Sequence, residues 1–264
     1  MIIYAVGLGP GDPDYLTPRA KEVILASGVI AGYTPYLELI TDLVKGKEII
    51  KSGMKGEVER CKAAIAEALK GKQVCVVSSG DAGIYGMASL LYELASQHDT
   101  MEVEVIPGIT AASSVAALLG SPLTNDFAVI SLSDLLTPWD VIEKRLELCS
   151  MADMALCLYN PQSKKRNDYL EKACAIVLRH KPPETNCGYV RNAYRGKSGE
   201  SRICALTELS KEPVDMLTTV IIGNSDTRVI NGKLVTVRGY RLITEGLKIK
   251  ENPTVEHELK IHQD

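Results

Sequence analysis

The sequence predicts an α/β protein made of two α/β domains with mainly parallel sheets. Apolar, strand-like runs alternate with helix-like segments through both halves of the 264-residue chain. Glycine-rich turns follow the first, fourth and fifth of these runs. A group of turn-forming residues at 120–126 then interrupts the alternation. Since open α/β sheets bind ligands at the carboxyl ends of their strands, these turns mark the expected site.

The first half is predicted to form a domain over residues 1–120. Strands are expected near 2–6, 28–31, 47–50, 73–77 and 103–106, with helices at 17–26 and 57–69 and another beginning near Ile84. In the helix at 57–69, five apolar residues recur at helical spacing on one face: Val58, Cys61, Ile65, Ala68 and Leu69. Such alternation is typical of a parallel sheet covered by helices on both faces.

The second half is predicted to form a domain over residues 121–243. Its strands are expected near 127–132, 154–159, 186–191, 202–206 and 218–222, and its helices at 139–148 and 164–179. Asn231-Gly232 separates two short β-rich runs, which indicates a hairpin with a type I′ turn. Residues 244–264 are rich in charge and contain Pro253, so they are expected to form a charged tail outside the sheet.

The composition, 45% hydrophobic and 24% charged, is typical of a soluble globular enzyme. The amino terminus has no charged segment followed by an apolar stretch and a cleavage site, so a cytoplasmic location is expected. No apolar run approaches the roughly 20 residues that span a bilayer, so no membrane partner is expected. A net charge of −3 without a basic stripe argues against nucleic acid. The seven cysteines form no C-x-x-C pair and the four histidines are isolated, which predicts buried, reduced thiols and no metal site.

The turn Val6-Gly7-Leu8-Gly9-Pro10-Gly11-Asp12 differs from a dinucleotide-binding loop. Its glycines do not follow the G-x-G-x-x-G spacing, and Pro10 removes a backbone N–H that a pyrophosphate would need. The next strand, at 29–31, has no carboxylate at its end to hold a ribose. The turn therefore favours a flat or bulky ligand against the main chain, or, alternatively, a strand-to-helix turn without any ligand.

Together with the turns Ser78-Ser79-Gly80-Asp81-Ala82-Gly83 and Pro107-Gly108-Ile109-Thr110-Ala111, this motif resembles the tetrapyrrole methylase family. The resemblance extends from Ile3 to about Tyr240. Within the family it is strongest to the branch that methylates C-17 of a corrin precursor. Six stretches carry that similarity: Gly32-Tyr33-Thr34-Pro35-Tyr36, Ser52-Gly53-Met54 with Glu57 and Arg60, 131–139, Tyr159-Asn160-Pro161, 191–195 and 221–225.

The resemblance implies an S-adenosylmethionine-dependent methyltransferase of cobalamin biosynthesis, with the cofactor in the cleft between the domains. It implies a precorrin-3B or cobalt-precorrin-3 substrate, contraction of the macrocycle and a homodimer. Two alternatives remain open: a sister methylase that acts at another macrocycle carbon, and a non-catalytic sensor of the cofactor or of a tetrapyrrole.

The resemblance also implies which residues hold the cofactor. These are Pro10, Ser79, Gly80, Asp81, Ile84, Thr110, Ala111, Tyr159, Asn160, Ala193, Thr218 and Thr219. Asp81 and Thr110 have an alternative role, because each precedes a predicted helix and belongs to a residue type that caps helices.

For the anionic macrocycle, the cluster Arg191, Arg195 and Arg202 is the predicted anchor, together with Lys55. The run Lys164-Lys165-Arg166 is interpreted as a solvated helix face. Methylases that act earlier in the pathway carry an acidic residue where this chain has Tyr33. Tyr33 is therefore the candidate catalytic residue, to orient the macrocycle or relay a proton, and an aromatic plug against the first sheet is the alternative.

Overall fold

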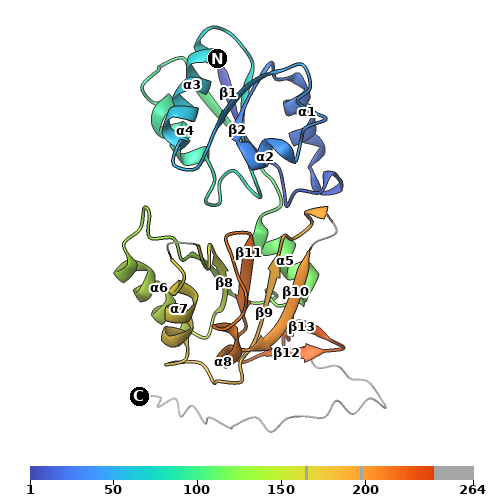
Figure 1. Ribbon diagram of the computed structural model, residues 1–264, viewed down its shortest axis with the longest axis vertical. Helices are drawn as coiled ribbons and strands as arrows, with labels where there is room; N and C mark the ends of the chain where they lie inside the picture. Colours follow the sequence, from blue (N-terminus) through green and yellow to red (C-terminus); the bar gives the residue numbers. More distant parts are fainter. Residues whose placement is uncertain (164–165, 197–198, 241–264) are drawn as a thin grey trace, which may run out of the picture.

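The computed structural model describes residues 1–163, 166–196 and 199–240, and these form two lobes stacked end to end (Figure 1). The predicted tail at 244–264, like Lys164 and Lys165, lies outside the described residues. Met1 lies at the end of the first lobe farthest from the second (Figure 1). The strands of the first sheet therefore run toward the second lobe, and their carboxyl ends face it.

The first lobe is a parallel sheet in the order β3-β2-β4-β1-β5. The strands are β1 (Ile2–Gly7), β2 (Val29–Tyr33), β3 (Glu48–Ser52), β4 (Val74–Ser78) and β5 (Glu102–Ile106). The helical segments are η1 (Pro13–Tyr15), α1 (Pro18–Ala26), α2 (Thr34–Glu38), α3 (Glu57–Leu69) and α4 (Ala88–Ala95). Each face has its own core, since Ile3 and Ala5 pack with residues of α3 and α4 while Val6 packs with residues of α1 and α2.

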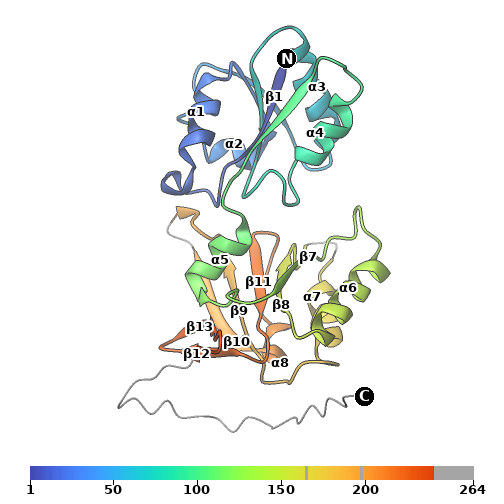
Figure 2. The same cartoon turned by 180° about the vertical axis from the view of Figure 1, so that it is seen from behind.

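The change from the first lobe to the second occurs earlier than the predicted boundary at residue 120. Helix α5 (Ala111–Leu119) packs on the second sheet, where it contacts β9 and β11 (Figure 2). Val115 and Leu119 are buried there against Val190 and Ile221. The connection is therefore the segment 107–110. Apolar spacing shows that a helix has a buried face but not which sheet it covers, so the sequence could not show that α5 packs on the second sheet.

The second sheet has the order β10-β9-β11-β8-β7. Its strands are β7 (Phe127–Ser131), β8 (Ala155–Tyr159), β9 (Asn186–Arg191), β10 (Glu200–Ala205) and β11 (Thr218–Ile222). Helices α6 (Trp139–Met151), α7 (Tyr169–Val177) and α8 (Leu206–Leu209) cover the face opposite α5.

The α/β class and the parallel first sheet are confirmed, but strand direction in the second sheet differs from the expectation. Strand β8 is parallel to β7, whereas β9 is antiparallel to β10 and β11, and β11 is antiparallel to β8. The link from β9 to β10 is too short for a crossover that would return the chain in parallel.

The second lobe also contains a small three-stranded sheet, with the order β12-β13-β6. Strands β12 (Thr227–Ile230) and β13 (Lys233–Thr236) form the predicted hairpin, and β6 (Gly120–Ser121) pairs with β13. Asn231 and Gly232 have φ values of 49° and 74°, as a type I′ turn requires.

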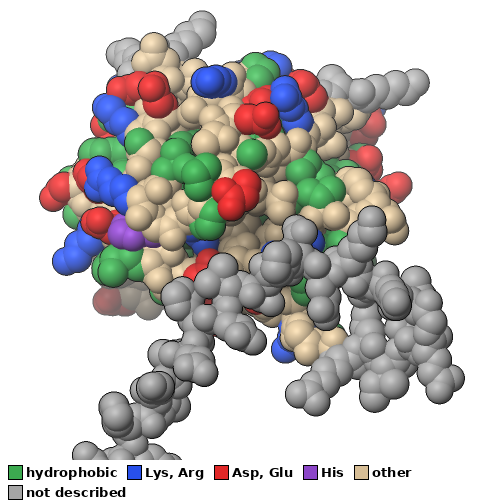
Figure 3. Space-filling view, turned by 90° about the horizontal axis from the view of Figure 1, so that it is seen from below, with side chains coloured by type: hydrophobic (Ala, Val, Ile, Leu, Met, Phe, Trp, Pro, Cys, Tyr) green, Lys and Arg blue, Asp and Glu red, His purple; other side chains and the backbone are tan. Residues whose placement is uncertain are grey.

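The expected buried thiols are confirmed for Cys75, Cys157 and Cys187, each of which is 0% exposed in a strand. Within the described residues, no helix is long and apolar enough to span a bilayer. At the end of the second lobe farthest from the first, acidic and basic side chains are interspersed with apolar ones (Figure 3).

Candidate functional site

The glycine-rich turns after β1, β4 and β5 are packed against one another at the edge of the first sheet. Gly9 and Gly80 form an antiparallel bridge, with N–H to carbonyl distances of 3.0 and 2.7 Å. A Cβ atom on Gly7 would lie 2.6 Å from the Gly108 nitrogen and 2.7 Å from the Gly80 oxygen. A residue with a side chain at position 7 would therefore keep the three turns from packing together.

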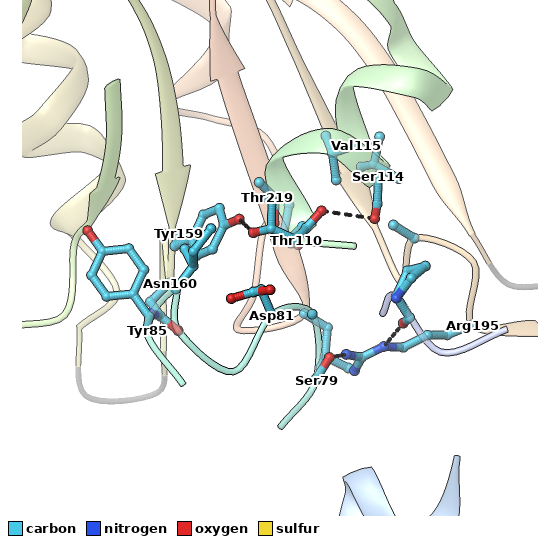
Figure 4. Close-up of a pocket in the computed structure, with 18 of the residues that line it drawn as sticks. Ser79, Asp81, Tyr85, Thr110, Ser114, Val115, Tyr159, Asn160, Arg195 and Thr219 are labelled. Carbon is cyan, nitrogen blue, oxygen red and sulfur yellow. Dashed lines mark hydrogen bonds between the residues drawn. The ribbon is translucent and has the colours of Figure 1, made fainter. Parts of the chain in front are cut away.

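A pocket lies where these turns face the second lobe (Figure 4). All the residues predicted to hold the cofactor line it: Pro10, Ser79, Gly80, Asp81, Ile84, Thr110, Ala111, Tyr159, Asn160, Ala193, Thr218 and Thr219. The structure thus brings together residues from both lobes that are more than 200 positions apart. Their role in binding stays a prediction.

Asp81 does not cap a helix, contrary to the alternative role considered for it. Helix α4 begins at Ala88 rather than near Ile84. The Asp81 carboxylate instead accepts hydrogen bonds from Gly83 N (2.7 Å) and Gly108 N (2.9 Å). The bond from Gly108 joins the second and third turns, and both bonds fix a carboxylate at the pocket wall, where it favours a cationic group.

Thr110 precedes α5, but its side chain does not cap that helix. The Tyr159 hydroxyl does so from β8, accepting the Ala112 N–H at 2.7 Å and lying 2.6 Å from the Thr110 hydroxyl oxygen (Figure 4). Burial raises the pKa of Tyr159 to about 12, so the phenol stays protonated at neutral pH. The pocket therefore holds a neutral, firmly positioned hydroxyl group.

Arg195 reaches from the second lobe to the first. Its guanidinium donates to the Pro10 carbonyl oxygen (3.0 Å) and to the Ser79 hydroxyl (2.5 Å), and both of these residues line the pocket. Burial lowers the pKa of Arg195, and the Tyr36 phenol partly opposes this shift. Arg195 thus belongs to the predicted cofactor pocket as well as to the predicted substrate anchor.

The three predicted substrate arginines do not form one cluster. Arg191 and Arg202 lie on the same sheet face as Tyr189, opposite α5, because side chains alternate along β9 and Arg202 pairs with Tyr189. Each is ion-paired, Arg191 with Asp215 at 2.9 Å and Arg202 with Glu212 at 3.0 Å. The spacing in sequence suggested a common patch, whereas strand alternation separates these side chains from Arg195.

Tyr33 and Lys55 lie at the cleft end of the first sheet. Tyr33 ends β2 and packs edge to face on Tyr36, with ring centroids 5.1 Å apart. Lys55 is exposed in the turn after β3, with a φ of 67°. Of the two tyrosines, Tyr36 lines the pocket.

Sequence reasoning also missed other lining residues: Tyr36, Tyr85, Ser114, Val115, Val190, Met216 and Leu217. Ser114 and Val115 follow Thr110 and Ala111 by one helical turn, a spacing from which they were predictable. No sequence pattern pointed to Tyr85, because its position depends on how the two lobes pack. Its hydroxyl donates to the Val129 carbonyl oxygen (3.2 Å) and accepts from the Ser131 N–H (3.1 Å), both in the second lobe.

The pocket fits S-adenosylmethionine better than a dinucleotide. Asp81 offers a carboxylate to a ligand with ammonium and sulfonium charges, and Thr110 and Thr219 add hydroxyl groups. Gly80 has a φ of 70°, and a side chain there would approach Thr110 and Ala111 across the turn. Pro10 offers a carbonyl oxygen but no N–H, which does not suit a pyrophosphate.

The family model for tetrapyrrole (corrin/porphyrin) methylases matches residues 2–207. The chain belongs to the tetrapyrrole methylase family. Membership makes it a methyltransferase that uses S-adenosylmethionine, and the predicted cofactor and enzyme class are thereby confirmed.

Among its relatives, a probable cobalt-factor III C(17)-methyltransferase of Salmonella typhimurium is 45% identical over 91% of this chain and 100% of its own length. The cobalt-factor III methyltransferase of Priestia megaterium is 43% identical over 90% of this chain, which spans 45% of that longer protein. The crystal structure of the methyltransferase CobJ superposes with a TM-score of 0.84 at 33% identity, covering 89% of this chain and 99% of CobJ. The two-domain fold and the cobalamin-pathway branch predicted from the sequence agree with these relatives.

Proposed function

We propose that this methyltransferase transfers the S-adenosylmethionine methyl group to C-17 of cobalt-factor III, or of its precorrin-3B counterpart, and promotes contraction of the macrocycle. One observation carries the proposal. Residues of both lobes that match the cofactor contacts of the family line one pocket at the carboxyl edge of the first sheet. Relatives covered over their full length and named for C-17 methylation support the position of transfer.

The cofactor supplies an activated methyl group, so the protein has to position two ligands and exclude water. Asp81 holds a fixed negative charge for the cationic part of the cofactor, and Tyr159 fixes the start of α5 beside it. Ile84, Val115 and Val190 line the pocket with apolar groups that displace water. The residues at the reacting centre are therefore mostly neutral.

Arg195 is proposed as the main anchor for a macrocycle carboxylate at this pocket, with Lys55, in the exposed turn after β3, as a second cation. Arg191 and Arg202 already pair with carboxylates, so a substrate would have to displace Asp215 or Glu212. Tyr33 stays the candidate for orienting the macrocycle or relaying a proton, and Tyr36 lies between it and the pocket. We also propose that the protein is a homodimer and that it is located in the cytoplasm.

Methyl transfer from ¹³C-labelled S-adenosylmethionine tests the position directly. Purified protein is incubated with cobalt-factor III and, separately, with precorrin-3B, and the products are analysed by mass spectrometry and NMR. We expect the product to gain one methyl group, and NMR to place the ¹³C-labelled methyl group on C-17. A label at another carbon would support the sister methylase instead, and tetrapyrrole binding without a change in mass would support the sensor.

A further inference from the structure

Arg60 is a buried cation that the pocket described above does not use. It lies on α3, and only 4% of its surface is exposed. The guanidinium donates one bond to the Ser52 hydroxyl and another to the Met87 sulfur, at 3.6 Å, and its Nε has no partner. Both acceptors are neutral, and the thioether is a weak one.

Arg60 has no ion pair within the described part of the chain. Glu57, one turn earlier on α3, accepts a bond from the Lys55 backbone N–H at 3.2 Å rather than from Arg60. A buried charge without a counterion is unfavourable, and natural proteins pair such charges. A buried guanidinium without a counterion is therefore expected at a site where a ligand supplies the anion.

Arg60 lies at the same edge of the first sheet as the cofactor pocket. Ser52 ends β3 beside Tyr33, its register partner on β2, while the pocket turns follow β4, β1 and β5. Met87 follows the β4 turn, and its N–H donates to Ser78 at 3.3 Å. The ends of β2 and β3 thus form a second part of this edge, next to the pocket.

Tyr36 connects the two parts of the edge. It lines the pocket and packs on Tyr33. Burial raises the pKa of Tyr36; the positive charges of Arg195 and Arg60 act in the opposite direction, while Tyr33 and the Glu57 carboxylate add to the rise. Arg195 lines the pocket together with Tyr36. Arg60 bonds Ser52, whose register partner Tyr33 packs on Tyr36.

The turn 53–56 covers the Ser52 side of the guanidinium. The Ser52 hydroxyl donates to the carbonyl oxygens of Gly53 (3.4 Å) and Gly56 (3.2 Å), and Gly56 has no room for a side chain because of this contact. Met54 and Lys55 in the turn are exposed. Displacing this turn would expose the guanidinium while removing little buried apolar surface from the core.

We propose that Arg60 binds a carboxylate side chain of the tetrapyrrole at the ends of β2 and β3, in exchange for its bonds to Ser52 and Met87. The planar guanidinium matches a carboxylate with two parallel hydrogen bonds. The macrocycle then lies between Arg60 and Arg195, with Tyr36 beneath it and the methyl donor beside it. This inference rests on the proposed function, since it assigns an anchor for the same class of substrate.

Arg60→Met tests the inference, because a binding role and a structural role predict opposite results. Methionine fills similar space without charge, so the thermal unfolding midpoint of the ligand-free variant should equal or exceed that of the unchanged protein. Its affinity for uroporphyrin III, an octacarboxylate porphyrin, measured by fluorescence titration, should fall at least ten-fold. Its affinity for S-adenosylhomocysteine should stay within two-fold.

Arg145→Met, on the exposed face of α6, is the matched control and should leave all three quantities unchanged. A lower unfolding midpoint together with unchanged porphyrin affinity would overturn the inference, as would an absence of porphyrin binding to the unchanged protein. If Arg60→Met does not fold, Arg60→Lys takes its place. Porphyrin binding that is several-fold weaker in Arg60→Lys, at an unchanged unfolding midpoint, supports the role of Arg60 as an anchor, and equal porphyrin binding overturns it. The titration needs no turnover, so its outcome is separate from that of the C-17 assay.

Discussion

At the residue scale, the pocket depends on side chains that satisfy backbone groups of a distant element. The Tyr159 hydroxyl caps α5 from β8, and the Asp81 carboxylate accepts from Gly108 on the next turn. These bonds hold polar atoms at the pocket wall, and of the two side chains only Asp81 carries a charge. Their loss should affect ligand binding and stability together.

Tyr159→Phe should lower the free energy of unfolding by about 1–2 kcal/mol, because it removes the bonds to Ala112 N and the Thr110 hydroxyl. It should also weaken S-adenosylhomocysteine binding several-fold. Tyr92→Phe removes an exposed hydroxyl bonded to Val103 O and serves as the control. Calorimetry and chemical denaturation measure both effects. Equal, small losses in the two variants would contradict the assigned role of Tyr159.

Arg195→Ala should weaken the binding of both ligands. Its guanidinium bonds two residues of the cofactor pocket and faces the proposed substrate, so each affinity should fall about ten-fold, which corresponds to about 1.4 kcal/mol. Arg202→Ala, on the opposite face of the sheet, should reduce neither by more than about two-fold. Separate titrations of S-adenosylhomocysteine and uroporphyrin III check this. A loss confined to the porphyrin would mean that the bonds to Pro10 and Ser79 are dispensable.

At the element scale, the carboxyl ends of β1, β4 and β5 form one unit, because their turns meet through glycines. The sequence was sufficient to predict most of the strands, the three turns and twelve of the residues that line the pocket, since each turn carries its motif locally. It did not reveal lining residues such as Tyr85, which reach the pocket only through the packing of the two lobes. It was not sufficient to assign α5 to the second sheet or to show that β9 and β10 are antiparallel. Those features depend on which surfaces pack together. The separation of Arg191 from Arg195 depends likewise on the face to which a strand residue points.

Gly7→Ala tests the close packing of the turns. Its Cβ would lie within 2.7 Å of backbone atoms of Gly80 and Gly108, so we expect a loss of about 1–3 kcal/mol in the free energy of unfolding. Gly28→Ala is the control, because a Cβ atom at Gly28 would have no other residue within 4 Å apart from its chain neighbours. Denaturant titration measures both variants. Equal stabilities would show that the turns can separate without penalty.

At the scale of the whole molecule, both lobes contain protonated groups buried in their sheets. Burial raises the pKa of Cys75 and of Cys157 to about 12, from 9 for an ordinary thiol in the unfolded chain. The unfolded chain therefore loses these protons at lower pH than the folded chain does. Their contribution to stability is complete below about pH 9 and is lost as the pH rises toward 12.

The free energy of unfolding should thus be nearly constant from about pH 7 to about pH 8.5 and fall steadily above about pH 9, with each buried thiol contributing up to about 1.4 kcal/mol per pH unit. Cys75→Ala should make the alkaline decline shallower, whatever its stability at neutral pH. Denaturant unfolding at a series of pH values gives the slope. An unchanged slope in the variant would show that the Cys75 thiol does not determine the decline.

We expect the methyl donor to bind between the lobes, at the carboxyl edge of the first sheet. A crystal structure with S-adenosylhomocysteine is the most direct test of this expectation. The ligand should occupy the pocket lined by Gly80, Asp81, Thr110, Tyr159 and Thr219, in contact with both lobes. Density for the ligand outside this pocket, or in contact with one lobe alone, would contradict it.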